Sequence, residues 1–190
     1  LQVREMIRLI DLCCENIDIK SLPTSDLEYL FLQLRIKSVG ETSDIMLECE
    51  SCQKENAITL DLETAEVKQK VENINHFVKL TSSVSIELQW PSYSMLEDMD
   101  QTNDLQSSDM FTLMSDCIVS VIDGEEVHTR DDFSKKELVS FYDSMSLIMF
   151  NDVQEFFNSA PTLVLVADFN CDECKKHNKI DLVGVGNFFA

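Results

Sequence analysis

Two short segments, separated by more than half of the chain, repeat one pattern of cysteines and strand-like runs. Residues 47–62 read LECESCQKENAITLDL, and residues 169–182 read FNCDECKKHNKIDL. In each segment an apolar residue precedes a Cys-x-x-Cys pair, a polar turn follows, and alternating apolar residues come next. This pattern is typical of a zinc knuckle, a tight turn between two strands that directs two sulfurs at one point. The sequence therefore predicts that the two segments form two halves of one site.

We expect Cys49, Cys52, Cys171 and Cys174 to bind one structural Zn²⁺ ion, because closed zinc sites use four thiolates in a tetrahedron. Four thiolates leave no position for water or substrate, so Lewis-acid catalysis is not expected. Redox-active pairs, a disulfide, an iron–sulfur centre and free thiols stay open as alternatives. A redox pair would need a thioredoxin-like βαβ context, which the sequence lacks. His177 could replace a ligand, but with four cysteines present we expect an exposed turn histidine.

The remaining chemically active residues give no catalytic arrangement. Cys13, Cys14 and Cys117 lie on apolar helical stripes and are expected to be small core residues. His76 and His128 lie in polar linkers, and no serine or cysteine nucleophile has a recognisable histidine partner. We therefore expect a protein without enzymatic activity.

The net charge of −20 restricts the classes of partner. Such a surface repels phosphate backbones and anionic lipids, so neither nucleic acid nor membrane is expected as a partner. No apolar run approaches the roughly 20 residues that span a bilayer, and no signal peptide opens the chain. Seven cysteines, an odd number, favour reduced thiols and a metal site over a secreted disulfide framework. The acidic stretch 97–132 is interpreted as a solubilising face or as a docking surface for a basic partner.

The apolar periodicity changes several times along the chain. It predicts helices over residues 3–19, 25–40, 108–122, 134–142 and 148–157, and strands near residues 45–47, 58–62, 77–80, 84–90 and 163–166. The predicted fold is α+β, with a mostly helical body and a small zinc-ribbon-like β lobe formed by the two Cys-x-x-Cys knuckles. Residues 1–43 and 91–162 are assigned to the body, and residues 44–90 and 163–190 to the lobe, as one interleaved unit.

Three segments together resemble the baseplate hub assembly proteins of T-even-type contractile-tailed phages. They are DLEYLFLQLRIKSVGE (26–41), ELQWPSYSMLEDM (87–99) and the helix pair of residues 131–174 that leads into the second cysteine pair. The order of the segments and their linkage to both cysteine pairs carry the resemblance, which covers nearly all of the chain. Since an N-terminal segment precedes the first helix in that family, the start at Leu1 predicts a missing N-terminal piece.

The resemblance implies a late protein of virion morphogenesis that binds other tail and baseplate hub proteins. It implies either a structural component or an assembly chaperone, present in the host cytoplasm during assembly or in the virion tail baseplate. The oligomeric state and the partner's identity stay open. Two alternatives are a zinc-ribbon interaction adaptor unrelated to phage and a thiol-disulfide oxidoreductase that uses the cysteine pairs.

Overall fold

The computed structural model describes residues 3–69, 74–97 and 107–189, and residues 98–106 of the acidic stretch therefore lie outside the described part. The chain divides into two compact units. The knuckle unit comprises residues 1–19, 24–68 and 161–190, and the inserted unit comprises residues 20–23 and 69–160.

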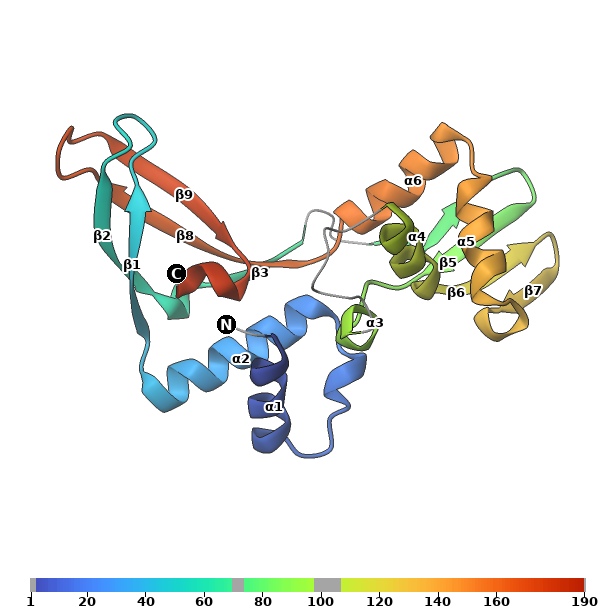
Figure 1. Cartoon of the computed structure of the whole chain (residues 1–190), viewed down its shortest axis with the longest axis horizontal. Helices are drawn as coiled ribbons and strands as arrows, with labels where there is room; N and C mark the ends of the chain where they lie inside the picture. Colours follow the sequence, from blue (N-terminus) through green and yellow to red (C-terminus); the bar gives the residue numbers. More distant parts are fainter. Residues whose placement is uncertain (1–2, 70–73, 98–106, 190) are drawn as a thin grey trace. The chain divides into compact units, whose positions relative to one another are not determined.

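Groups of helices and groups of strands follow one another along the chain (Figure 1). The helices are α1 (Val3–Cys13), α2 (Thr24–Val39), α3 (Tyr93–Glu97), α4 (Ser107–Asp116), α5 (Lys135–Asp143) and α6 (Leu147–Asn158). The strands are β1 (Thr42–Glu48), β2 (Glu55–Asp61), β3 (Glu66–Lys68), β4 (Phe77–Lys79), β5 (Val84–Leu88), β6 (Ile118–Asp123), β7 (Glu126–Thr129), β8 (Thr162–Asn170) and β9 (His177–Val183). Short 3-10 turns lie at Ile19–Ser21, Leu62–Thr64, Arg130–Asp132 and Val185–Phe188.

The prediction of a mostly helical body with one small β lobe is wrong. Within the described residues the strands form three antiparallel sheets, with the orders β1-β2, β3-β8-β9 and β4-β5-β6-β7. The last of these sheets lies in the inserted unit, and its strands β6 and β7 fall in residues 91–162, which had been expected to be helical. The unit boundaries also differ from the sequence-based division, because residues 77–90 join residues 91–160 in the inserted unit.

One cause of this error lies at the end of α4. A helix was expected to continue to residue 122, but α4 ends at Asp116 and Ile118 begins strand β6. Ile118 and Val121 match a helical spacing, yet the run IVSVI is rich in β-branched residues, whose stiff side chains fit a pleated strand better than a helix. Pairing of β6 with both β5 and β7 then outweighs the local helical pattern.

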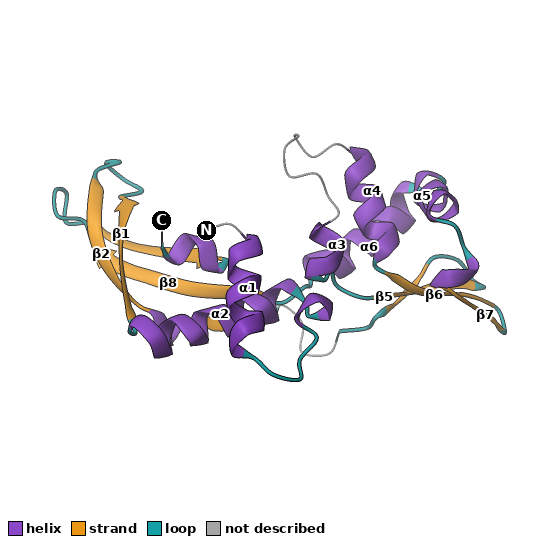
Figure 2. Ribbon diagram, turned by 60° about the horizontal axis from the view of Figure 1, so that its bottom comes forward, coloured by secondary structure: helices purple, strands orange, loops and turns teal. Residues whose placement is uncertain are grey.

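The knuckle unit joins two β-hairpins to two helices. β1 pairs with β2, with Thr42 opposite Asp61, and β8 pairs with β9, with Asn170 opposite His177. β3 adds to the other edge of β8. Figure 2 shows α2 running beside the strands of this unit, and α2 contacts β8. α2 therefore supports the hairpin that carries Cys171 and Cys174, and α1 packs on α2.

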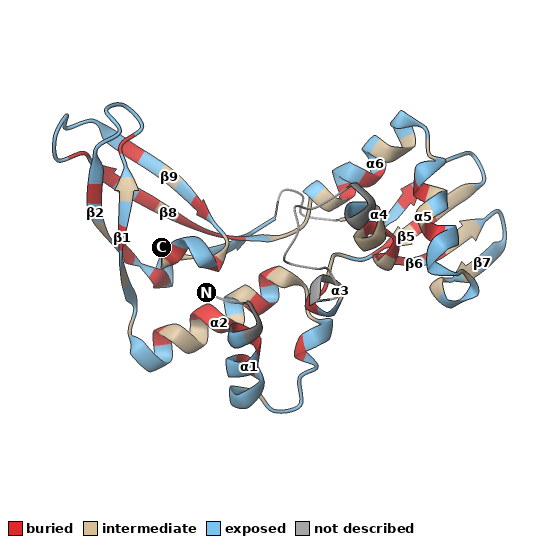
Figure 3. Ribbon diagram, viewed as in Figure 1, coloured by how far each residue is buried: buried red, intermediate tan, exposed pale blue. Residues whose placement is uncertain are grey.

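Apolar side chains from these helices and strands fill the core of the knuckle unit. Buried and exposed residues alternate along β2 and β9 (Figure 3), as expected for strands with one face on a core. The core includes Ile7, Ile10, Leu27, Phe31, Leu32, Ile45, Leu60, Leu163, Leu165, Phe169, Leu182 and Phe188. Full burial of each such side chain contributes about 1.5–3 kcal/mol.

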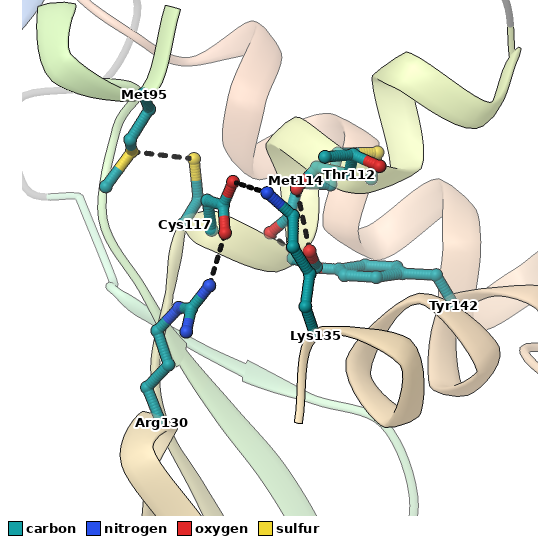
Figure 4. A network of polar contacts seen from close by, with 9 residues as sticks. Met95, Thr112, Met114, Cys117, Arg130, Lys135 and Tyr142 are labelled. Carbon is teal, nitrogen blue, oxygen red and sulfur yellow. Dashed lines mark hydrogen bonds and ion pairs between the residues drawn. The ribbon is translucent and has the colours of Figure 1, made fainter. Parts of the chain in front are cut away.

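Within its described residues the inserted unit contains the helices α3 to α6 and the four-stranded sheet, and α6 contacts β4. Its core is a cluster of Val78, Ile86, Leu88, Met114, Ile118, Leu138, Tyr142, Val153 and Phe156. The buried Tyr142 hydroxyl donates a hydrogen bond of 3.1 Å to the Met114 carbonyl (Figure 4). Asp116 accepts from Arg130 and from Lys135, which links the end of α4 to the segment that starts α5.

Candidate metal centre

The four predicted ligand residues lie together at the turns of the two hairpins. Their sulfurs all lie within 4.8 Å of one another. The Cys49 sulfur is 3.7 Å from that of Cys174, and the Cys52 sulfur is 3.6 Å from that of Cys171. In Figure 1 the β1–β2 and β8–β9 turns extend from the same end of their hairpins. The shortest sulfur contacts therefore connect the two hairpins.

The backbone of the first turn explains how its two cysteines reach one point. The Cys49 amide donates to the Lys54 carbonyl over 2.9 Å, and the Gln53 amide donates to the Cys49 carbonyl over 2.8 Å. Gln53 has a φ of 58°, in the left-handed region that a non-glycine residue rarely adopts. This conformation turns the chain sharply just after Cys52 and returns it into β2.

The second turn has the same construction. The Cys171 amide donates to the Lys176 carbonyl, and the Lys175 amide donates to the Cys171 carbonyl, both over 2.9 Å. Lys175 has a φ of 61°, matching Gln53. The repeat that is visible in the sequence is therefore also a repeat of backbone hydrogen bonds.

Each knuckle supplies one buried and one exposed sulfur residue. Cys49 and Cys171 are fully buried, whereas Cys52 and Cys174 are exposed. A bound ion would thus be screened by the hairpins on one side and lie near the surface on the other. Such a position suits a structural ion that ties two turns together.

Backbone amides favour the thiolate form of the two buried cysteines. Hydrogen bonds from the Cys52 and Ser51 amides lower the pKa of Cys49 to about 6. The Cys174 amide similarly holds the pKa of Cys171 below its usual value.

Crowding by the neighbouring sulfurs raises the pKa of Cys52, in contrast to the lowered pKa values of Cys49 and Cys171. The backbone hydrogen bond at Lys54 lowers the pKa of the Cys52 thiol, but the neighbouring Cys174 sulfur, burial and the other two sulfurs together raise it to about 12. Four thiolates so close together repel one another unless a cation lies among them. The donor set is therefore one that a divalent cation would complete.

The sulfur spacing fits zinc well. Zinc–sulfur distances of about 2.3 Å in a regular tetrahedron give sulfur–sulfur edges of about 3.8 Å. The two short contacts of 3.7 and 3.6 Å are close to this edge. Soft sulfur ligands also select zinc or iron over calcium and magnesium.

The other cysteines and histidines lie elsewhere. Among the described residues, the group of side chains placed to hold a metal contains the four cysteines and does not include His177. His177 is an exposed strand residue, and its Nε2 lies 2.7 Å from Asp168 Oδ1. Cys117 is buried in the core as predicted, and burial raises its pKa to about 12. The prediction of a core position for Cys13 is wrong, because Cys13 is exposed where α1 ends.

Sequence reasoning missed two residues next to the centre. Asn56 and Asn178 are the seventh residues after Cys49 and Cys171, so the true repeat is Cys-x2-Cys-x3-Asn. Both asparagines are buried. The repeated asparagine is visible in the sequence, but only the structure shows that each side chain bonds to the opposite hairpin.

Comparison with known proteins gives one match. A family model described as T4 bacteriophage base plate protein matches residues 2–190. The chain belongs to this family. No curated protein and no solved structure matches.

Membership in this family confirms the resemblance drawn from the sequence, and it gives the protein a structural role among the components of a phage base plate. A base plate protein binds other tail components and belongs to the virion tail. No helix in the described segments has the length and apolar character needed to cross a membrane.

Proposed function

We propose that this base plate protein is a non-enzymatic hub assembly factor, closed by one structural zinc ion bound to Cys49, Cys52, Cys171 and Cys174. The observation that carries the proposal is the convergence of four sulfurs within 4.8 Å from two hairpins distant in sequence. The hub assignment rests on the resemblance of residues 26–41, 87–99 and 131–174 to hub assembly proteins.

In this proposal the zinc ion stabilises the folded knuckle unit and takes no part in catalysis. Structural zinc in small peptides contributes on the order of 10–16 kcal/mol of apparent binding free energy. A typical domain has a net stability of about 5–15 kcal/mol. An ion shared by the two hairpins would therefore dominate the stability of the knuckle unit. With all four ligand positions taken by thiolates, the ion would offer no open position for a substrate.

Two measurements test the proposal. Purified protein should contain one zinc per chain by atomic emission spectrometry, and cobalt substitution should give the absorption spectrum of a tetrahedral tetrathiolate site. Tagged protein expressed in infected cells should capture hub proteins of the tail, and assembly intermediates should contain it. Absence of stoichiometric metal would overturn the zinc assignment, and capture of unrelated host proteins alone would overturn the hub assignment.

A thiol-disulfide oxidoreductase is the second candidate, because the pKa of Cys49 is lowered to about 6 by backbone amides. Reactive thiolates commonly have lowered pKa values. The burial of Cys49 argues against attack on a protein disulfide, since the sulfur must reach its substrate. Catalysis of disulfide exchange by metal-free protein, faster than by a Cys49→Ser variant, would favour this candidate.

A further inference from the structure

Asn56, on β2, joins the first hairpin to the turn of the second. Its Oδ1 accepts a hydrogen bond of 2.8 Å from the Asp172 amide. Its Nδ2 donates over 2.7 Å to the Lys54 carbonyl in its own turn. One side chain therefore contacts the backbone of both knuckles.

Asn178, on β9, makes the reciprocal pair of contacts. Its Oδ1 accepts a hydrogen bond of 3.1 Å from the Glu50 amide in the first knuckle. Its Nδ2 donates over 2.9 Å to the Lys176 carbonyl of its own turn. Each asparagine thus holds its own turn with its amide nitrogen and the opposite turn with its oxygen.

The two backbone amides that donate to the asparagines, those of Glu50 and Asp172, lie next to buried cysteines. Glu50 directly follows Cys49, and Asp172 directly follows Cys171, so each amide lies within a Cys-x-x-Cys turn. Fixing that peptide restricts the orientation of the cysteine before it. Asn56 and Asn178 are only 2% and 1% exposed, so loss of either would remove a shielded hydrogen-bond partner from the amide of the opposite turn.

We propose that Asn56 and Asn178 are positioning residues that brace the two knuckles reciprocally and preset the four sulfurs for metal binding. Asparagine fits this role because its side chain offers an acceptor and a donor at once, and aspartate could not donate. The brace itself needs no metal, because its bonds run between side-chain amides and backbone. Its effect on metal affinity rests on the proposed zinc function.

Metal affinity tests the positioning role. Asn56→Ala and Asn178→Ala should each weaken zinc binding about 10–100-fold in competition with a chromogenic chelator, as changes in outer-shell partners commonly do. The cobalt spectrum should also broaden, since the sulfurs lose their fixed positions. The matched control is Asn187→Ala, which removes a 2.6 Å bond to the Val183 carbonyl in the same unit but at an exposed position. The control should bind zinc like the wild type, and equal affinity in all four proteins would overturn the proposal.

Amide hydrogen exchange tests the reciprocity. Asn56→Ala should speed exchange at Asp172 and leave Glu50 protected, whereas Asn178→Ala should speed exchange at Glu50 and leave Asp172 protected. General loosening of the fold would instead speed both amides in both variants, and that result would overturn the brace. If the wild type binds no zinc but shows the crossed pattern, the zinc function fails and the brace stands.

A measurement on the wild type covers the case in which the variants do not fold. A long-range HNCO experiment detects coupling through a hydrogen bond. It should connect the Asp172 amide nitrogen to the Asn56 side-chain carbonyl carbon, and the Glu50 amide to that of Asn178. The bond from the Cys49 amide to the Lys54 carbonyl, at 2.9 Å, serves as internal reference. A visible reference without the two asparagine couplings would overturn the proposal.

Discussion

The sulfur of Cys52 lies 3.6 Å from the sulfur of Cys171, although the two residues are 119 positions apart in the chain. This contact ties the β1–β2 turn to the β8–β9 turn and so connects the first and last parts of the knuckle unit. Closing so long a loop costs chain entropy, which the contacts at the turns must offset.

Replacing one ligand should release the metal and loosen only the knuckle unit. Cys171→Ser should contain less than one zinc per chain, and its thermal transition should fall, while far-UV circular dichroism keeps most of the helical signal. Cys13→Ser is the matched control because Cys13 is exposed and distant in sequence from the four ligands. Unchanged metal content in Cys171→Ser would disprove the ligand assignment.

Glycine should stabilise the knuckle turns. Gln53 and Lys175 have φ values of 58° and 61°, a conformation that costs an L-residue roughly 1–2 kcal/mol. Because glycine also gains freedom in the unfolded chain, Gln53→Gly should stabilise by about 0.5–1 kcal/mol net. Gln53→Val should destabilise the protein by roughly 1 kcal/mol or more, since a β-branched residue fits this backbone region poorly. Urea denaturation measures both, and an equal effect of the two changes would contradict the explanation.

Glu28 should make stability depend on pH. Burial raises the pKa of this half-buried carboxyl above 4.5, against a backbone hydrogen bond at Val185 that lowers it. Well below the ordinary pKa of 4.5, the carboxyl is neutral in both the folded and the unfolded chain. As the pH rises through the folded-state pKa, burying the charge lowers the free energy of unfolding.

Glu28→Gln should therefore raise Tm more at pH 7 than at pH 4. Differential scanning calorimetry at the two pH values measures this difference. Glu15→Gln, at an exposed residue of the same unit, controls for the change in net charge. A similar rise in Tm for both variants would point to general charge repulsion instead of burial.

Removing the Tyr142 hydroxyl should weaken the inserted unit modestly. Tyr142→Phe loses the hydrogen bond to the Met114 carbonyl, but that carbonyl still accepts from the Cys117 amide at 3.2 Å. The expected loss is about 1 kcal/mol, near the value of a single net hydrogen bond. Urea denaturation followed by tyrosine and tryptophan fluorescence measures it. A loss above about 3 kcal/mol would mean that the ring packing had changed as well.

The knuckle unit should fold without the inserted unit. Lys68 pairs with Thr162, so the chain leaves and re-enters the knuckle unit at adjacent positions. An Asn-Gly turn that joins these two residues in place of residues 69–161 should preserve the β3–β8 pairing. The shortened protein should bind one zinc ion and unfold cooperatively. A molten product without metal binding would show that the knuckle unit needs the rest of the chain.

The sequence predicted local features well where one physical signal dominated. The cysteine repeat predicted the hairpins and their meeting point, and Ser134 with Glu137 predicted the capping box at the start of α5. The end of α2 at Val39 also follows the signal of Gly40, whose φ is 132°.

The sheet of the inserted unit was harder to predict because its pairing is non-local. β7 is short, and β6 carries a spacing that also matches a helix. Only the pairing of Val121 with both Ile86 and His128 decides its structure. The asparagine brace was missed for a similar reason, since its bonds link residues more than 100 positions apart.

The placement of the inserted unit sets an order of events during synthesis. Cys52 leaves the ribosome 119 residues before Cys171, which at 5–20 residues per second is an interval of roughly 6–24 s. Throughout that interval the first knuckle has no partner, while the inserted unit is translated and begins to fold. The two hairpins can therefore join only after the inserted unit has been synthesised, so the metal centre records that this unit is already present.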